Sequence, residues 1–119
     1  MEERTLTITI NPDWKSALRV AARAGFTADN YHGESLNFET PGAFFSRLTS
    51  RRWAMLEALM GAGEVPVREL ARRLQRDVKR VHEDASALVE LGLIERTDRG
   101  GLLCPYTDLH MDMHLRRAA

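Results

Sequence analysis

The sequence predicts an α+β fold, with three helices and a β-hairpin in the middle of the chain and further strands near its two ends. Two observations support this class. Apolar residues recur at helical spacing between residues 50 and 91, whereas residues near both ends alternate between apolar and polar, as in half-buried strands. The composition, 44% hydrophobic and 29% charged in 119 residues, is that of a folded globular protein.

Residues 1–48 are expected to form a strand–helix–strand extension that serves as a sheet or a dimer interface. The stretch from Thr5 to Ile10 alternates strictly, which is typical of a half-buried strand. Asp13 can cap a helix that ends at Gly25. The remaining elements expected here are a turn at 30–33, a strand at 35–39, and a short helix that begins with Thr40 as N-cap and Pro41 at its first position.

Residues 49–104 are expected to form a helical domain. Ser50 can cap a first helix, Val67 to Leu74 predict a second, and Asp77 can cap a third that runs to residue 91. The gap between the second and third helices is about three residues, the length that a helix-turn-helix uses. The spacing predicts that the third helix turns four residues inward: Val78, Val81, Ala85 and Leu88.

A β-hairpin is expected directly after the third helix, over residues 93–103. Leu93 to Thr97 predict its first strand, residues 98–101 a tight turn, and Leu102 begins the return strand. Val65–Pro66 is expected to be only a short break. The C-terminal segment, 105–119, is expected to add a strand at 109–115 that packs on the N-terminal sheet or in a dimer interface, with four residues inward: Leu109, Met111, Met113 and Leu115.

Three helices followed by a hairpin define a winged helix-turn-helix, which predicts binding of double-stranded DNA. The recognition helix, 77–91, would enter the major groove, and the wing, 93–103, would lie against the backbone. Base contacts are expected from the outward residues near the start of the recognition helix: Arg76, Lys79, Arg80 and Glu83. Phosphate contacts are expected from Arg72 and Arg73 on the second helix, Arg51 and Arg52 on the first, and Arg96 and Arg99 on the wing.

The net charge does not by itself indicate nucleic-acid binding. There are 17 Lys and Arg residues against 17 Asp and Glu residues, so the chain is neutral, whereas many DNA-binding domains are basic. The prediction therefore depends on how the charges are distributed. Four acidic residues of the helical domain can be placed away from the predicted DNA-binding face: Glu57, Glu64, Glu69 and Glu90.

A resemblance to a known family rests on four stretches of the helical domain. They are RWAMLEAL at 52–59, VRELARRL at 67–74, RDVKRVHED at 76–84 and LVELGLIE at 88–95. Over about half its length the chain resembles the MarR/ArsR-like winged-helix transcriptional regulators of prokaryotes, and within them a small group of which some members are encoded beside toxins. The resemblance implies a homodimer that acts as a repressor or an antitoxin, with Arg76, Lys79 and Arg80 as recognition residues.

Metal and redox sites are expected to be absent. ArsR-type metal sensors usually carry a cysteine pair on the recognition helix, and this helix has none. His110, Asp112 and His114 share one face of the last strand and could hold zinc or nickel, but the polar face of an amphipathic strand is the favoured explanation. His82 is expected to be partly buried, and the single cysteine, Cys104, is expected to be structural.

The remaining expectations concern the class of protein. No phosphate loop, nucleophile elbow or acid pair is present, so neither an enzyme nor a cofactor is expected. No apolar run is long enough for a membrane span, and one cysteine fits the reducing cytoplasm. The first function expected is that of a sequence-specific regulator of transcription. The alternative is an antitoxin-like module that binds and neutralises a partner protein by adding a strand to a sheet.

Overall fold

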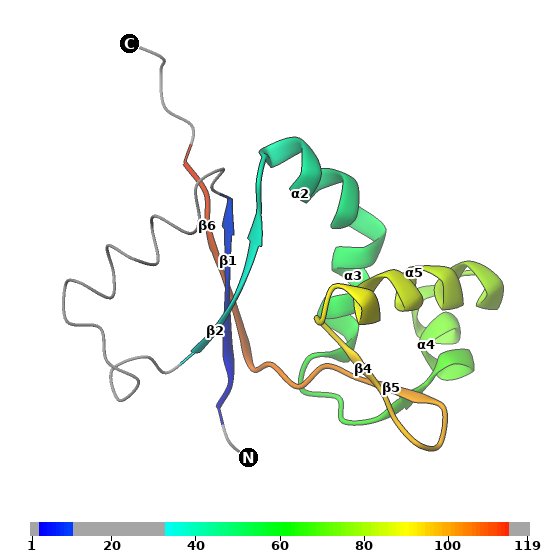
Figure 1. The fold of residues 1–119 in the computed structure, drawn as a ribbon. Helices are drawn as coiled ribbons and strands as arrows, with labels where there is room; N and C mark the ends of the chain where they lie inside the picture. The colour runs from blue at the N-terminus through cyan, green and yellow to red at the C-terminus, as the bar shows by residue number, and fades with distance from the viewer. Residues whose placement is uncertain (1–2, 11–32, 115–119) are drawn as a thin grey trace, which may run out of the picture. The chain divides into compact units, whose positions relative to one another are not determined.

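The computed structural model describes residues 3–10 and 33–114, which contain four helices and two three-stranded sheets (Figure 1). The predicted α+β class is therefore confirmed. The chain forms two compact units, residues 47–107 and residues 1–46 with 108–119. Three expected features lie outside the described residues: the helix between Asp13 and Gly25, the turn at 30–32, and the final residue of the strand at 109–115.

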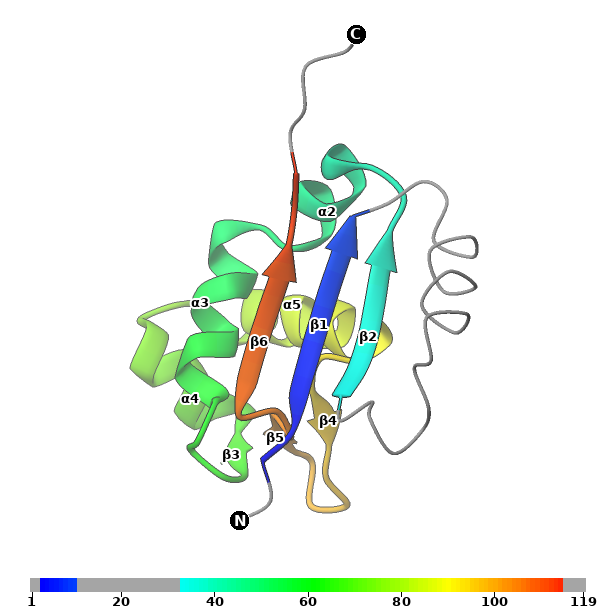
Figure 2. The same cartoon turned by 90° about the vertical axis from the view of Figure 1, so that its left-hand side faces the viewer.

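The first sheet joins strands from both ends of the chain. Its order is β2 (Gly33–Phe38), β1 (Thr5–Ile10) and β6 (Asp108–Asp112), with β1 in the middle (Figure 2). Both neighbours run parallel to β1. Of the two placements expected for the last strand, the structure shows the one in the N-terminal sheet; β2 begins two residues earlier than predicted and β6 ends sooner.

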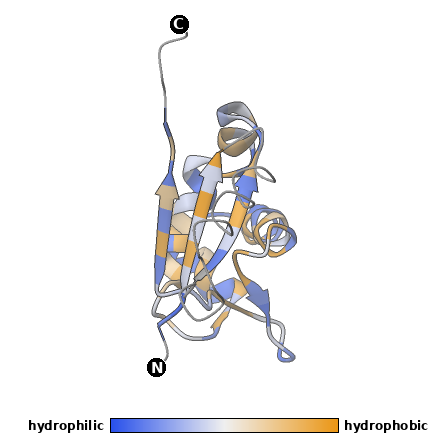
Figure 3. Ribbon diagram, turned by 60° about the vertical axis from the view of Figure 1, so that its left-hand side comes forward, coloured by the Kyte–Doolittle hydropathy of each residue, from blue (hydrophilic) through white to orange (hydrophobic). Residues whose placement is uncertain are grey.

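The two faces of this sheet differ in polarity, as the alternating colours of the strands show (Figure 3). Leu6 and Ile8 are buried, with exposed fractions of 3% and 0%, and Ile8 is in register with Leu36 and Met111. On the other face, the Thr9 hydroxyl donates a hydrogen bond of 2.7 Å to the Asn37 side chain. The strict alternation of β1 therefore produces one apolar and one polar face.

The inward placement expected for the methionines of the last strand is wrong. Met111 and Met113 are 42% and 39% exposed. Met111 does lie on the same face as Ile8, as its register shows. It is nevertheless exposed because β6 is an outer strand, and alternation alone cannot distinguish an outer strand from a central one.

Helix α2 (Pro41–Arg47) follows β2 through a capped turn. The Thr40 hydroxyl accepts a hydrogen bond of 3.0 Å from the Ala43 amide, which confirms the expected N-cap. Phe44 packs edge-to-face on Phe38, with ring centroids 5.4 Å apart.

The second unit contains α3 (Ser50–Leu59), α4 (Val67–Leu74) and α5 (Val78–Glu90). Thr49, not Ser50 as expected, caps α3, because it is the Thr49 hydroxyl that accepts a hydrogen bond from the Arg52 amide. None of the described helices has the length and apolar character needed to cross a membrane. Their apolar stripes meet in a core whose buried residues include Met55, Leu56, Leu59, Leu70, Ala71, Val81, Ala85 and Leu88.

The turn between α4 and α5 is shaped by a residue in the left-handed conformation. Gln75 has a φ of 53°. The Gln75 amide bonds to the Arg72 carbonyl at 3.2 Å, and the Arg76 amide bonds to the Ala71 carbonyl at 3.0 Å. Together these bonds form a Schellman motif, which ends α4 abruptly and allows Asp77 to cap α5 through a bond from the Arg80 amide.

Replacing Gln75 with glycine is expected to stabilise the protein by about 1 kcal/mol, because glycine adopts a positive φ without the steric cost that a Cβ atom brings. The midpoint of urea unfolding measures the change. Gln75→Ala is the matched control and should not stabilise, since it keeps the Cβ atom. Equal stability of the two variants would contradict the expectation.

The second sheet is antiparallel and has the order β3 (Val65–Pro66), β5 (Gly101–Leu103), β4 (Glu95–Arg96). Val65–Pro66 is thus a strand and not merely a break; a two-residue strand lies below the length at which alternation can be recognised. The predicted strand from Leu93 to Thr97 is reduced to β4. The Leu93 amide is used at the end of α5, where it bonds to the Leu88 carbonyl at 3.0 Å. The hairpin turn is closed by Gly100, whose φ of 84° favours glycine.

Candidate nucleic-acid interface

Helix α5 carries the residues expected to read DNA. Its buried side, formed by Val81, Ala85 and Leu88, is inaccessible to solvent. Lys79 and Arg80 are exposed, and neither forms an ion pair with another residue of the described ranges. The first turns of α5 therefore present two free cationic side chains to solvent.

Two residues of α5 differ from the prediction. Val78 was expected inward but is 44% exposed, and His82 was expected to be partly buried but is exposed. The spacing identifies the side of a helix that packs, but it does not show how far along the helix the packing extends. Val78 is the first residue of α5, where the buried side has not yet begun.

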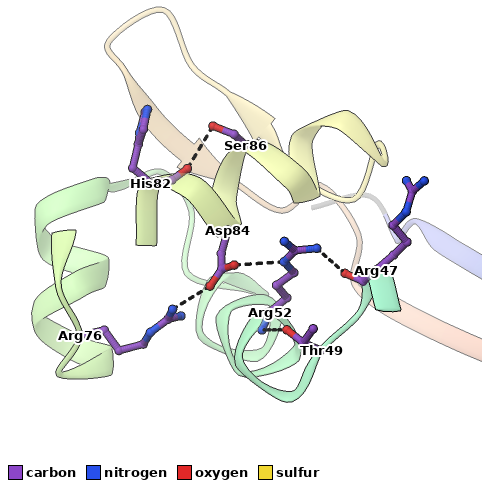
Figure 4. Close-up of polar contacts among 7 residues, drawn as sticks. All are labelled: Arg47, Thr49, Arg52, Arg76, His82, Asp84 and Ser86. Carbon is purple, nitrogen blue, oxygen red and sulfur yellow. Dashed lines mark hydrogen bonds and ion pairs between the residues drawn. The ribbon is translucent and has the colours of Figure 1, made fainter. Parts of the chain in front are cut away.

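Asp84 connects α5 with two arginines from other parts of the unit (Figure 4). Its carboxylate accepts a hydrogen bond of 3.1 Å from Arg52 Nε on α3 and one of 2.7 Å from an Arg76 nitrogen in the α4–α5 turn. All three side chains are mostly buried, with exposed fractions of 18%, 23% and 17%. Arg52 also donates to the Arg47 carbonyl at 2.9 Å.

This arrangement corrects the outward placement expected for Arg76, whose side chain is only 17% exposed. The DNA contacts expected of Arg76 and Arg52 would require both side chains to leave Asp84, which holds them within the unit. One nitrogen of Arg76, Nη1, is buried without a hydrogen-bond partner among the described residues. Asp84 was missed as a site residue, although Val81 and Leu88, at positions i−3 and i+4, already place it next to the buried side of α5.

The electrostatics of Asp84 follow from this environment. Burial raises the pKa of its carboxyl, but the hydrogen bonds and positive charges of Arg76 and Arg52 together lower it more, so that the pKa lies below the ordinary value of 3.8. Asp84 therefore remains ionised at neutral pH and is paired with both arginines.

A small pocket opens beside this cluster, with a volume of about 130 Å³. This is room for roughly four water molecules. Its wall contains four arginines and two acidic residues, so its net charge is positive. The residues that line it are Thr49, Arg51, Arg52, Arg76, Arg80, Glu83 and Asp84.

The rim of the pocket has the properties of a phosphate site. Arg51 and Arg80 are exposed and form no ion pair with a described residue, whereas Arg52 and Arg76 lie deeper and are held in place. Arg51 also lies in the first turn of α3, where backbone amides point outward and the helix dipole favours an anion. Glu83, which was predicted as a base contact, is exposed. It is the one acidic residue of the pocket lining besides Asp84.

The two arginines at the end of α4 share one carboxylate. Glu69 pairs with Arg72 and, at 3.0 Å, with Arg73. Hydrogen bonds from Arg72 and Arg73 lower the pKa of Glu69 to about 2. The Arg72 and Arg73 side chains are nevertheless 73% and 46% exposed, so both can reach an approaching anion. Glu69 neutralises part of their positive charge, which weakens the attraction.

The two arginines of the hairpin, Arg96 and Arg99, differ in how firmly their side chains are held. Arg96 on β4 donates a hydrogen bond of 2.7 Å to the Ser86 hydroxyl on α5, which in turn bonds to the His82 carbonyl. Arg99 lies in the turn, is exposed and has no ion-pair partner among the described residues. Arg68 at the start of α4 is also exposed and was missed by sequence reasoning, because isolated surface arginines carry no pattern.

The candidate metal and cysteine sites have ordinary explanations. Within residues 3–10 and 33–114, no group of three or more potential ligands could hold a metal ion. His114 pairs instead with Asp112 at 3.1 Å. The Cys104 side chain is buried near the Leu93 carbonyl, and burial raises the pKa of its thiol, so it is protonated and unreactive at neutral pH.

The comparisons with known proteins place the helical unit within a family. The model of a family called HVO_A0114 matches residues 47–111, more than half of the chain. No curated protein and no solved structure matches the chain.

Proposed function

The chain belongs to the HVO_A0114 family, and we propose that it is a winged-helix regulator of transcription that binds double-stranded DNA. The helical unit supports this proposal. It combines α4, the Schellman turn and α5 with a hairpin that follows α5 directly, which is the element order of a winged helix-turn-helix. The resemblance to MarR/ArsR-like regulators leads to the same proposal.

The observation that carries the proposal is the exposed pair Lys79 and Arg80 on the first turns of α5. This end of a recognition helix meets the base edges in helix-turn-helix docking. Arginine can bind guanine through two hydrogen bonds, and lysine can bind guanine or a phosphate. Both side chains are exposed and unpaired in the described structure, so binding DNA would not require an existing ion pair to break.

Phosphate contacts are proposed on both sides of α5. Arg51 and Arg80 at the rim of the pocket would hold one backbone phosphate, with the α3 amides behind it. Arg72 and Arg73 would contact the backbone from α4, and Arg99 from the hairpin turn, where the wing would lie. Arg96 is kept in position by Ser86 and would contribute mainly charge.

The proposed mode of action is occupation of a promoter by a homodimer in the cytoplasm. A two-fold symmetric dimer presents two recognition helices, which suits operators with two half-sites about one helical turn apart. Such a protein would act as a repressor or would regulate its own gene.

Titration of duplex DNA from upstream of the protein's own gene, at several salt concentrations and beside a random duplex of equal length, tests this function. For about four to eight phosphate contacts, the logarithm of the affinity should fall against the logarithm of the salt concentration with a slope of about −4 to −7. Tighter binding to the upstream DNA than to the random duplex is expected. Failure to bind either duplex would overturn the proposal and would favour the protein-binding module.

A further inference from the structure

The outer edge of strand β6 offers unpaired backbone groups. In the first sheet, β6 pairs with β1 on one side only, and no described strand pairs with its other side (Figure 2). A free strand edge is a template for pairing with another strand, and proteins usually cover or blunt such edges. Two exposed methionines, Met111 and Met113, lie at this edge, and an apolar side chain does not discourage pairing as a charged residue or a proline would.

One hydrogen bond establishes which residues of β6 point their backbone groups outward. The Asp108 amide donates to the Arg4 carbonyl, immediately before β1, at 3.3 Å. Because successive residues of a strand point their amide and carbonyl groups to opposite edges, those of His110 and Asp112 also face β1. Within β6 the free edge therefore presents the amides and carbonyls of Leu109 and Met111, and those of Met113 would follow if the strand were extended by one residue.

The side chains of the same segment alternate between two chemically distinct rows. Leu109 and Met111 are in register with Leu6 and Ile8 on the apolar face. His110 and Asp112 are in register with Thr7 and Thr9 on the polar face. His114 lies on the polar side as well, because it pairs with Asp112 at 3.1 Å.

We propose that a second copy of the chain pairs antiparallel with this edge, about a two-fold axis through Met111. The pairing places Met111 opposite Met111 of the second copy, and it makes every other pair complementary. Apolar Leu109 lies opposite Met113, and basic His110 lies opposite acidic Asp112. Asp108 lies opposite His114. Each of these pairs occurs twice because the axis is two-fold.

The backbone geometry agrees with this register. In an antiparallel ladder, directly opposed residues exchange two hydrogen bonds when their amides and carbonyls face each other. Met111 and Leu109 have both groups outward, and Met113 would join them once pairing extends the strand by one residue, which gives about six hydrogen bonds across the axis. His110 and Asp112 then fall at the non-hydrogen-bonded positions, where opposed side chains lie closest and an ion pair is strongest.

Neighbouring registers do not share this agreement. A shift of the axis to His110 or to Asp112 places like residues opposite each other, His110 on His110 or Asp112 on Asp112. Opposed carboxylates are destabilising, and two opposed imidazoles form no ion pair. Such a shift would also leave the central residue with its backbone groups facing β1, so the central hydrogen bonds would be lost. Axes through Leu109 or Met113 keep the backbone groups outward, but each opposes only one kind of acidic–histidine pair, whereas the axis at Met111 opposes two.

The other outer strand of the sheet, β2, has no such self-complementarity. Its segment Gly33–Phe38 contains one acidic residue, Glu34, and no basic residue, so no register within the strand places opposite charges across it. Glu34 is moreover engaged by Arg4, at 2.8 Å. The pairing of two copies through β6 would join two three-stranded sheets into one of six strands, with a continuous apolar face across the axis.

The proposed interface specifies the homodimer that the DNA-binding proposal invokes, but it stands on the strand edge and does not depend on DNA. The test is the molar mass of the full chain in solution, by sedimentation or light scattering, for two double variants. His110→Asp with His114→Asp makes the edge wholly acidic, and Asp108→Lys with Asp112→Lys makes it wholly basic. The wild type should be a dimer at micromolar concentration and each variant alone a monomer, whereas an equimolar mixture should form a one-to-one heterodimer.

Restored pairing in the mixture also shows that both variants have folded. A monomeric wild type, or variants that each dimerise as well as the wild type does, would overturn the interface. So would variants that remain monomeric when mixed while their circular dichroism is unchanged. DNA binding is measured separately, so the two proposals can fail independently. A chain that binds DNA as a monomer would overturn only the proposed interface, and a dimer that binds no DNA would overturn only the proposed regulator function.

Cross-linking checks the register independently of charge. Met111→Cys should form a disulfide-linked dimer under mild oxidation, because opposed hydrogen-bonded residues have Cα atoms about 5.5 Å apart, within disulfide range. His110→Cys is the matched control and should not cross-link, since its counterpart lies diagonally across the axis, beyond about 7 Å. Cross-linking of the control but not of Met111→Cys would contradict the proposed axis.

Discussion

Arg80→Ala is expected to weaken the binding of the upstream duplex about 10-fold or more, and the double variant with Lys79→Ala about 100-fold. A good arginine–guanine contact contributes about 1–3 kcal/mol of discrimination, and a lost phosphate contact lowers affinity for all sequences. Both side chains are exposed, so the free energy of unfolding should change by less than about 0.5 kcal/mol. Fluorescence anisotropy of labelled DNA measures the affinity, and urea unfolding measures the stability.

Two arginine variants serve as controls for these effects. Arg4→Ala removes the same charge from the unit that holds the first sheet, where Arg4 pairs with Glu34, and should leave affinity nearly unchanged. Arg76→Ala should lower stability, since it leaves the mostly buried Asp84 with one partner fewer. If Arg4→Ala and Arg80→Ala weakened binding equally, the proposed DNA-binding face of α5 would be wrong.

Asp84→Asn is expected to destabilise the protein by about 2–3 kcal/mol. The asparagine has the same shape but no charge, so Arg52 and Arg76 would remain largely buried without their shared counter-ion. Each of the three side chains keeps about a fifth of its surface exposed, which makes the loss smaller than for a fully buried pair. The midpoint of urea unfolding at neutral pH measures it.

Glu83→Gln, one residue earlier on α5, is the matched control for Asp84→Asn. Glu83 is exposed and should contribute less than about 0.5 kcal/mol. Similar losses in the two variants would show that the Asp84 cluster does not stabilise the unit.

The same cluster predicts a dependence of stability on pH. The pKa of Asp84 is lower in the folded chain than its ordinary value of 3.8, because the hydrogen bonds and charges of Arg76 and Arg52 together outweigh burial. Its contribution is therefore fully present above about pH 4, and it is lost as the pH falls through the folded-state pKa. Asp84→Asn should reduce this acid sensitivity, while the part due to Glu69 persists. An unchanged acid profile would show that Asp84 is not the group that titrates.

Most of the secondary structure follows from local patterns. The alternation at residues 5–10 and the helical spacing at 67–74 predict β1 and α4 with the bounds that the structure has. The cap at Asp77 is confirmed as well. These features depend on interactions between residues close in the sequence, namely side-chain periodicity and a hydrogen bond over three residues.

The exposed part of the candidate site was also accessible from the sequence. Lys79, Arg80 and Glu83 were placed outward by elimination, since the apolar residues of α5 occupy the other side. The same reasoning was wrong for Arg76, because its burial depends on Asp84, which also holds Arg52. The distance between Asp84 and Arg52, 32 positions apart, is decided by how α3 and α5 pack.

The sequence by itself thus determined the α+β class, most helices and strands, and the exposed cations of α5, all of which follow from short-range periodicity and charge. Only the tertiary structure decided that β1 lies between β2 and β6, that Val65–Pro66 is a strand, and that two of the predicted DNA-contacting arginines are held by Asp84. The physical reason is the same in each case. Strand neighbours and buried ion pairs are chosen by contacts between residues far apart in the chain, which no local pattern contains.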